Sequence, residues 1–345
     1  MRVMVTGGTG FVGCHSTAQL LDAGHEVRLL VRDPARLEAA LGPLDLSPDR
    51  VDHVVGDMCD ADSVGRALDG CDAVLHSAAV LAVTDRALAA QALERNAAGA
   101  HTVLGAAADR GLDPLVYVSS VGAIFDPGLT ALTPDAAVSD RRGAYERSKA
   151  EGERYARRLQ ADGVPVVVTY PNMVLGPASP TLGDTFGGLI TALKRRVGQC
   201  QAGGWSVSDV RDVAAVHTAA MTPGRGPRRY MAGGQLLSFA QLADILQDVT
   251  GRPMRGLPVS GRVLRTLGRS MDVVRRVVDF DTVFSLEAMQ FATEMVPTDY
   301  HRTTEELGVE FRDPTETLMD SVAWLYRAGH ISAALAGRAA GGAPR

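Results

Sequence analysis

The sequence predicts an α/β protein with a doubly wound parallel sheet, and three observations lead to that prediction. Short apolar runs alternate with helix-patterned segments through the first half of the chain. Most of these runs are apolar without strict alternation, which is typical of strands covered on both faces. A glycine-rich turn at residues 7–13 separates the first apolar run from the first helical segment.

Each element is predicted from its own pattern, in chain order. Strands are indicated by β-branched and apolar residues, and helices by 3.6-residue spacing with glycine at their ends. The predicted strands are residues 2–8, 26–32, 72–79, 114–121 and 165–177. The predicted helices between them are residues 13–25, 62–71, 92–111 and 144–156.

Composition excludes several classes of protein. The chain has 345 residues, 46% of them apolar, and a net charge of −5, which gives no general attraction to nucleic acid. Its four cysteines show no C-x-x-C pair and no metal-ligand spacing, so we expect reduced thiols and no metal site. No secretory signal is recognisable, and no apolar run approaches the roughly 18 residues of a spanning helix. We expect a soluble, cytoplasmic protein.

The glycine turn predicts dinucleotide binding. Glycine stands at every third position, and a second set of glycines satisfies G-x-G-x-x-G. Glycine would let the backbone approach a pyrophosphate, which the N–H groups of the following helix would hold. The alternative is an ordinary glycine-rich turn. The residues expected to contact the cofactor here are Gly7, Gly10, Phe11, Val12 and Gly13.

The end of the second strand bears on the choice of cofactor. NAD-binding proteins of this kind place an acid there, on the 2′-hydroxyl of the ribose. This chain has Val31 followed by Arg32, and an arginine can pair with a 2′-phosphate. Arg32 therefore favours NADP(H) over NAD. The alternative is that it is an ordinary surface arginine beside Asp33.

Tyr145 and Lys149 form a possible proton-transfer pair. The charged pattern of residues 144–156 predicts a solvent-facing helix, on which positions four apart share a face. An ammonium beside a phenol lowers the phenol pKa from about 10, so the tyrosine could exchange a proton with an alcohol oxygen. Ser119 and Ser120 end a predicted strand, where a hydroxyl could bind the same oxygen. Without that context the pair would be a solvated helix face.

These segments resemble the extended short-chain dehydrogenases/reductases, over nearly the whole chain to about Gly329. The motifs that carry the resemblance are "TGGTGFVG", "GDMCD", "HSAA", "RNAAGA", "VSS", "YERSK" and "YPNMVLGP". "DVRDVAAVH" and "ETLMDSVAWL" resemble one branch, which holds dihydroflavonol-4-reductase-like, cinnamoyl-CoA-reductase-like and 3-beta-hydroxysteroid-dehydrogenase-like proteins. The resemblance implies a Rossmann domain that carries a smaller, discontinuous, mostly helical substrate domain.

The resemblance also implies roles for individual residues. Tyr145 is the acid/base, and Lys149 lowers its pKa and binds the nicotinamide ribose. Ser120, preferred to Ser119 because it directly precedes "VGA", polarises the carbonyl. The remaining cofactor-site residues are implied at the adenine (Asp57, Met58), along the groove (Ser77, Ala78, Ala79), on a supporting helix (Asn96) and near the nicotinamide (Pro171, Met173).

The expected function is NADP(H)-dependent reduction of a ketone or aldehyde, or oxidation of the matching alcohol. The alternatives are an NAD-dependent sugar epimerase or dehydratase and a non-catalytic dinucleotide-binding sensor. Tyr170 stands where many members have arginine, and Leu175 replaces a frequent tyrosine, which weakens the sugar interpretation. Val121 replaces alanine after the serine. The substrate stays open between a flavonoid-like ketone, a hydroxysteroid, a cinnamoyl-type thioester and a simple aldehyde.

The expected domains are residues 1–174 with about 204–222 for the cofactor, and about 175–203 with 223–330 for the substrate. Residues 331–345 are expected to be a flexible tail. The helices at 94–111 and 144–156 resemble the pair through which this family forms homodimers, so we expect a homodimer.

Two further segments have open interpretations. Residues 261–278 carry arginines among apolar residues, so this helix could lie on a membrane surface. We favour the alternative, in which its apolar face covers the substrate pocket or packs on the second domain. Residues 224–230 form a basic loop that could meet an anionic substrate, although a solvated loop is favoured. His76 is expected to be structural.

Overall fold

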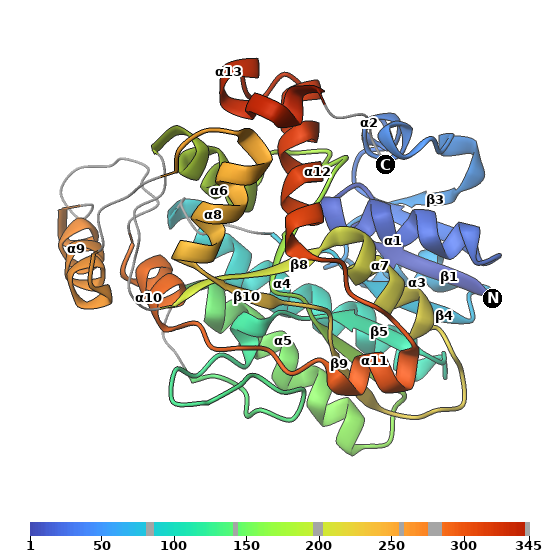
Figure 1. Cartoon of the computed structure of the whole chain (residues 1–345). Helices are drawn as coiled ribbons and strands as arrows, with labels where there is room; N and C mark the ends of the chain where they lie inside the picture. The colour runs from blue at the N-terminus through green and yellow to red at the C-terminus, as the bar shows by residue number, and fades with distance from the viewer. Residues whose placement is uncertain (81–85, 141–143, 196–202, 255–258, 275–284, 342–345) are drawn as a thin grey trace.

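The computed structural model describes residues 1–80, 86–140, 144–195, 203–254, 259–274 and 285–341. Of residues 86–93, 144, 145 and 195 it describes the backbone alone. Two sheets organise the chain, a large one built mainly from the first half and a small one that later segments complete (Figure 1).

The large sheet has seven parallel strands in the order β3-β2-β1-β4-β5-β6-β9. They are β1 (Arg2–Thr6), β2 (Glu26–Val31), β3 (Asp52–Val55), β4 (Ala73–His76), β5 (Leu115–Val118), β6 (Val166–Tyr170) and β9 (Arg228–Met231). The strand order reverses between β1 and β4, so a crevice is expected beyond their carboxyl ends. The prediction of a doubly wound parallel sheet is confirmed.

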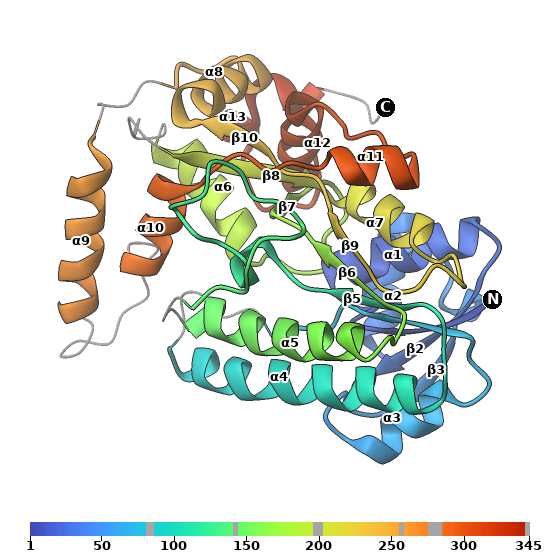
Figure 2. The same cartoon turned by 90° about the horizontal axis from the view of Figure 1, so that it is seen from below.

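Helices cover both faces of this sheet. On one face lie α3 (Ala61–Leu68), α4 (Arg86–Asp109) and α5 (Ala144–Ala161), and Figure 2 shows α4 and α5 side by side. On the other lie α1 (Phe11–Asp22), α2 (Arg36–Leu41) and α7 (Val210–Ala219). Neighbouring strand residues point to opposite cores, as Met4 and Val5 do. Both therefore need to be apolar, which is why the strands lack alternation.

The small sheet has the order β10-β8-β7, with β7 (Met173–Leu175) parallel to β8 (Gly204–Asp209) and β10 (Gln235–Ser238) antiparallel to it. It shares a third core with α6 (Asp184–Arg195), α8 (Phe239–Thr250) and α12 (Pro314–Arg327). The strand predicted over residues 165–177 is therefore two strands. Pro171 has no N–H with which to continue the ladder of β6, and the chain crosses to the other sheet.

Strand pairing places two segments in a different sheet from the one that the expected domain boundaries imply. β8 lies in the small sheet although residues 204–222 were expected beside the cofactor, whereas α7 does pack on the large sheet. β9 completes the large sheet although residues 223–330 were expected in the second domain. As edge strands with polar residues, β3 and β9 carry little of the apolar pattern on which strand prediction depends.

The segment expected to be a flexible tail is ordered through residue 341. It forms α13 (Ala333–Ala336) and a 3₁₀ helix (Gly337–Gly341), with Ala336 and Ala339 buried in the third core. Gly337 has a φ of 56°, and a Cβ there would lie 1.8 Å from the Thr250 carbonyl oxygen. Small residues therefore allow close packing here rather than disorder.

Three helices complete the described chain: α9 (Gly261–Val274), α10 (Leu286–Glu294) and α11 (His301–Leu307). In Figures 1 and 2, α9 is the outermost element on its side, with α10 between it and the rest of the protein. The Phe291 ring of α10 packs on Phe125, 4.7 Å between centroids, and so ties α10 to the first core.

Candidate active site

The turn between β1 and α1 presents backbone amides to the crevice. Gly7 has a φ of 75°, and a Cβ there would lie 2.7 Å from Ala78 N. A Cβ at Gly13 would lie 2.1 Å from the Gly7 carbonyl oxygen, so α1 also needs glycine to reach the turn. Gly10 caps α1 without a side-chain hydrogen bond, and a Cβ there would meet the Gly7 oxygen at 3.3 Å. The first amides of α1 are therefore available to an anion, and a pyrophosphate fits this turn.

The ends of β2 and β3 form the next part of the site. Arg32 directly follows β2 and is exposed. Asp57 accepts a hydrogen bond from Cys59 N at 2.9 Å and pairs with Arg95 at 2.5 Å. Burial opposes the ionisation of Asp57, but these partners hold its pKa below the ordinary value. Burial and Asp57 raise the pKa of the Cys59 thiol while Arg95 and Arg32 lower it, which places Arg32 near this loop.

β4 ends at a buried histidine. His76 Nδ1 lies 2.7 Å from Thr6 Oγ1, and the ring stacks on Tyr117 with centroids 5.8 Å apart. Burial, together with the charge of Lys149, lowers the pKa of His76 to about 3, so the imidazole is neutral at pH 7. These contacts support the structural role expected of His76.

Asn96 fixes the loop that follows β4. Its Oδ1 accepts a hydrogen bond from Val80 N at 2.8 Å, and its Nδ2 donates to Val80 O at 3.0 Å. The same Nδ2 donates to Ser148 Oγ of α5 at 2.8 Å. Ser77 Oγ holds the start of the loop through Thr6 O, at 2.8 Å. Asn96 thus joins the groove loop to α5, in line with the supporting role predicted for it.

Two serines follow β5. Ser120 is buried, and its Oγ accepts a hydrogen bond from Gly122 N at 3.1 Å. Ser119 Oγ is also buried and has no hydrogen-bond partner among the described residues. Ser119 N donates to Thr169 O at 2.9 Å, which ties this end of β5 to β6.

Tyr145 and Lys149 lie one turn apart in α5, although the Tyr145 side chain is outside the described part of the structure. Lys149 is 6% exposed, and burial lowers its pKa to about 8. Its charge acts on the pKa of His76, so it lies near the end of β4. A poorly solvated ammonium stabilises any negative charge that develops beside it.

The segment between the two sheets borders the serine end of β5. Val121 N donates to Pro171 O at 3.1 Å. Asn172 Nδ2 donates to Gly233 O at 3.0 Å, and Met173 then begins β7. Pro171 therefore lies beside the serine end of β5, two residues before the small sheet begins at Met173.

The predicted site residues come together at the carboxyl edge of the large sheet. The strand-end loops and turns hold Gly7, Gly10, Arg32, Asp57, Met58, Ser77, Ala78, Ala79, Ser120 and Pro171. The first turn of α1 holds Phe11, Val12 and Gly13, and β7 begins at Met173. Asn96, Tyr145 and Lys149 come from α4 and α5. The described residues contain no group of three or more His, Cys, Asp or Glu side chains that could hold a metal ion.

The burial of polar side chains on α5 was not predicted from the sequence. Glu153 is fully buried and accepts hydrogen bonds from Tyr170 Oη at 2.5 Å and from Arg157 Nε at 2.7 Å. The spacing of Glu153 and Arg157 was a signal, but such pairs are usual on exposed helix faces. The polar side chains that α5 buries are Glu146, Ser148, Lys149 and Glu153.

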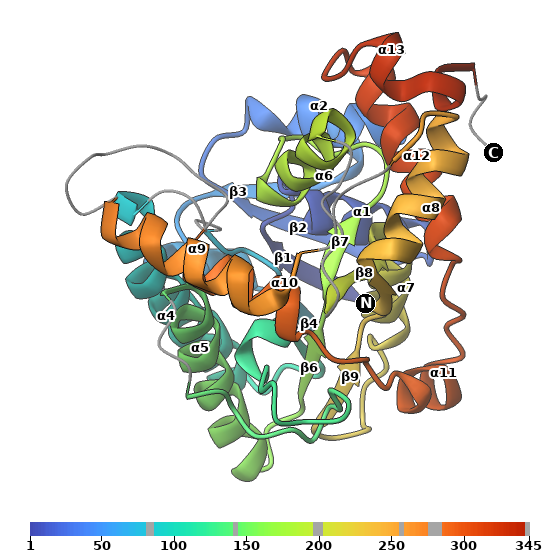
Figure 3. The ribbon, with the colours of Figure 1, turned by 60° about the vertical axis from the view of Figure 1, so that its left-hand side comes forward.

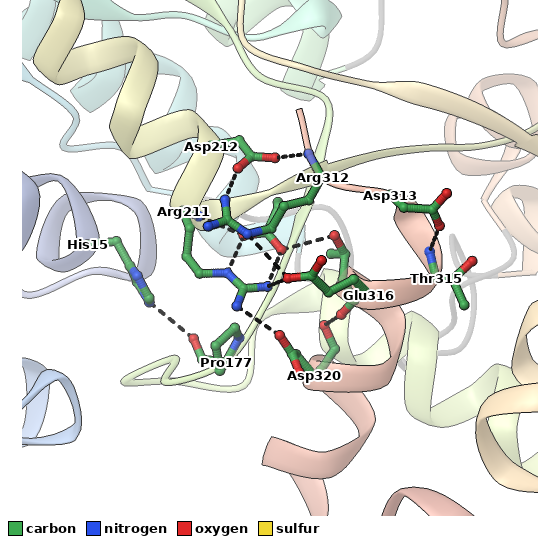
Figure 4. A network of polar contacts seen from close by, with 12 residues as sticks. His15, Pro177, Arg211, Asp212, Arg312, Asp313, Thr315, Glu316 and Asp320 are labelled. Atoms are coloured by element: carbon green, nitrogen blue, oxygen red, sulfur yellow. Dashed lines mark hydrogen bonds and ion pairs between the residues drawn. The ribbon is translucent and has the colours of Figure 1, made fainter. Parts of the chain in front are cut away.

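A second network, also not predicted, joins α7 to α12, and a further contact joins α1 to the chain after β7 (Figure 4). Arg211 of α7 donates to the buried Asp209 at 2.7 Å and to Asp320 of α12 at 2.8 Å. His15 of α1 lies with Nε2 3.1 Å from Pro177 O, and burial lowers its pKa to about 4. The helix that opens at the glycine turn is therefore connected to the chain that leaves β7.

A glycine turn that opens a helix at the switch point of a doubly wound sheet defines a dinucleotide-binding α/β protein. The chain belongs to the NAD dependent epimerase/dehydratase family, whose model matches residues 3–233. It is thus an extended short-chain dehydrogenase/reductase, an oxidoreductase that uses a nicotinamide dinucleotide, and the resemblance seen in its motifs is confirmed.

Two proteins of similar sequence are reductases by name, and a solved structure of lower identity shares the fold. The chain is 30% identical to "Putative dihydroflavonol 4-reductase" of Synechocystis sp., over 95% of each chain. It is 28% identical to cinnamoyl-CoA reductase 1 of Petunia hybrida, over 83% of this chain and 92% of the relative. A UDP-glucose-4-epimerase from Stenotrophomonas maltophila, solved with NAD, superposes with a TM-score of 0.75 at 20% identity, over 96% of this chain and all of the epimerase.

Proposed function

We propose that the protein is an NADP(H)-dependent oxidoreductase that reduces a ketone or aldehyde, or oxidises the matching alcohol. The observation that carries the proposal is the buried Lys149, one helical turn from Tyr145 and close to the end of β4. Ser120 follows the neighbouring strand, β5. A buried ammonium and a hydroxyl near the ends of neighbouring strands, with Tyr145 one helical turn from the ammonium, suit proton transfer to an oxygen.

The residues divide the reaction between them. The nicotinamide dinucleotide, held at the glycine turn, supplies or accepts the hydride. Ser120 donates a hydrogen bond to the carbonyl oxygen and so favours negative charge on it. Tyr145 gives its proton to that oxygen as the alkoxide forms. Lys149, still mainly protonated at pH 7 with its pKa of about 8, stabilises the phenolate that remains.

Arg32 supports NADP(H) over NAD. It is exposed at the end of β2 and lies near the loop of Asp57 and Cys59, where the adenosine ribose is expected. A guanidinium there can pair with a 2′-phosphate. The epimerase structure named above contains NAD, so this preference has to be measured.

A carbonyl reductase is favoured over a sugar epimerase by two side chains as well as by the names of the relatives. Tyr170 is fully buried, with its hydroxyl bound to Glu153 and Arg157. Leu175 is also fully buried, within the third core. Neither can contact a nucleotide sugar without disrupting the core.

The proposal is tested by measuring NADPH oxidation with flavonoid-like ketones, ketosteroids, cinnamoyl-type thioesters and simple aldehydes, with NADH in parallel. We expect turnover in at least one class, with NADPH preferred, and an Arg32→Gln variant that loses that preference. Turnover of nucleotide sugars alone, on NAD that co-purifies, would identify an epimerase. Tight NADPH binding without any turnover would identify a sensor.

We also propose a homodimer formed through α4 and α5, which pack on each other along one face of the sheet (Figure 2). Light scattering after gel filtration at micromolar concentration tests this proposal. A monomer there would contradict it.

A further inference from the structure

The helix α9 is amphipathic, and several of its large apolar residues face away from the protein, whereas Leu264 packs against the third core. The residues it buries are Gly261 and Gly268, and a Cβ at Gly268 would lie 2.7 Å from Ser285 O at the start of α10. Val263, Leu267 and Val274 are 58%, 42% and 45% exposed. Their spacing of four and seven residues puts them on one helix face. We call these three residues the α9 strip.

The α9 strip is part of an unusual concentration of exposed apolar side chains. The described residues include seven large hydrophobic side chains that are exposed, and α9 carries four of them, the strip and Val273. Single exposed apolar residues are normal, whereas a cluster marks an interaction surface. The expectation that apolar residues of this helix pack over the substrate pocket or on the second domain applies to Leu264, which packs against the third core, and not to the α9 strip. Residues 275–278 of the predicted helix lie outside the described residues.

Arginines accompany the strip. Arg262 and Arg269 are exposed on a neighbouring side of the helix, and neither has an ion-pair partner in the described structure. Arg265 pairs with Glu294 of α10 at 3.3 Å. The acid of this helix, Asp272, accepts a hydrogen bond from Leu286 N at 3.0 Å and so is turned toward α10. The outer side of α9 thus combines apolar and cationic groups.

We propose that α9 docks the protein reversibly on an anionic lipid membrane. The α9 strip enters the interface between headgroups and acyl chains, while Arg262 and Arg269 contact lipid phosphates. α9 stands at the outer edge of the molecule, in front of α10 in Figure 3, so the helix can lie on a flat surface. No described helix is long and apolar enough to cross a membrane, so the contact is peripheral.

Charge favours a membrane over a second copy of the chain. A symmetric dimer through this face would bring the arginines of both copies together, because a two-fold interface uses the same patch twice. Like charges across an interface oppose association. An anionic lipid surface attracts the same arginines.

The experiment is cosedimentation of the full-length protein with phosphatidylcholine vesicles, with and without phosphatidylglycerol. We expect binding to the anionic vesicles that weakens as salt is added. Replacing Leu267 and Val274 together by Asp should lower binding at least about tenfold. Replacing Arg262 and Arg269 by Gln should lower it by about fivefold for each arginine. The matched control is Met319→Asp on α12, an exposed apolar residue outside α9, which should bind like the unmodified protein.

Three outcomes would overturn the proposal. The first is unmodified protein that stays in the supernatant with anionic vesicles. The second is a Leu267→Asp, Val274→Asp variant that binds as well as the unmodified protein while its circular dichroism and melting temperature are unchanged. The third is a dimer, seen by light scattering, that this variant dissociates without any vesicle binding, which would make a second copy the occupant of the strip.

Discussion

The helices α5 and α9 are built in opposite ways, although both carry charges along their length. The charged sequence of α5 predicts a solvent-facing helix, yet its Lys149 and Glu153 side chains are buried. α9 has an apolar face that suggests packing, yet it buries glycines and exposes Val263 and Leu267. α5 packs against α4 and β6 on the large sheet, whereas α9 contacts α10 at the outer edge (Figure 2).

The difference shows that the amphipathic pattern of a helix indicates which side chains share a face, but not where that face points. In α5, buried charges are retained because each has a partner or a chemical task, since an unpaired buried charge is costly. In α9, exposed apolar groups are retained where a second surface can cover them. Substitutions in and around the two helices test this difference in burial.

The largest effect is expected at the active-site end of α5. Tyr145→Phe removes the proposed proton donor and should lower turnover by about 10²–10⁴-fold while NADPH affinity changes little. The control is Tyr155→Phe, ten residues further along the helix, where the ring stacks on His101. Steady-state kinetics and NADPH fluorescence titration give both quantities. Comparable turnover in the two variants would show that Tyr145 has no such role.

Lys149→Met should abolish turnover and yet stabilise the fold. The folded-state pKa of Lys149, about 8, lies below the ordinary lysine value of 10.5, so the unfolded chain holds one more proton between these pH values. The unmodified protein should therefore gain stability as pH rises from about 8 toward 10.5, and the variant should lack this rise. At pH 7 we expect the variant to be more stable by about 3 kcal/mol. Urea unfolding at pH 7 and pH 9 measures this.

The exposed Lys194 provides the matched control for that experiment. Lys194→Met should change the free energy of unfolding by no more than about 0.5 kcal/mol at either pH. Equal effects at the two lysines would mean that Lys149 is solvated and that α5 does not bury its charge.

The buried carboxylate of α5 predicts a smaller effect. Tyr170→Phe removes a hydrogen bond to the fully buried Glu153 and should destabilise the protein by about 1.5–3 kcal/mol. Tyr230→Phe removes a similar bond, 2.7 Å long, to the exposed Glu306, and should cost about 1 kcal/mol or less, because water can replace it. Chemical denaturation of both variants measures the two losses of unfolding free energy. Equal losses would show that water reaches Glu153.

The smallest effect is expected in α9, where replacing a large apolar residue should cost less stability than replacing a glycine by alanine. Leu267→Ser removes a large apolar side chain but should change stability by less than about 0.5 kcal/mol, because the residue is exposed. Gly268→Ala should destabilise by about 1 kcal/mol despite the better helix propensity of alanine, because its Cβ would approach Ser285 O. Thermal unfolding of the two variants measures their stability. A larger loss for Leu267→Ser than for Gly268→Ala would show that the α9 strip is packed.

Much of the fold and of the cofactor site was predictable because the signals are local. The glycines of residues 7–13 are required by backbone conformation and close approach, so they are visible without knowledge of the tertiary structure. The buried strands of the large sheet are apolar on both faces because each face packs against a core, and such an apolar run is visible in the sequence. The edge strands β3 and β9 and the sheet change at Pro171 were not predicted, because pairing partners distant in the chain decide them.

By itself the sequence determined the class of the sheet, because strands covered on both faces are apolar throughout. It also determined the glycine turn and the spacing of Tyr145 and Lys149, because these depend on residues close together in the chain. Only the tertiary structure decided which charges α5 buries, that Asn96 joins the loop after β4 to Ser148, and that α9 turns its apolar face outward. The physical reason is that burial depends on what covers a side chain, and the covering elements come from distant parts of the chain.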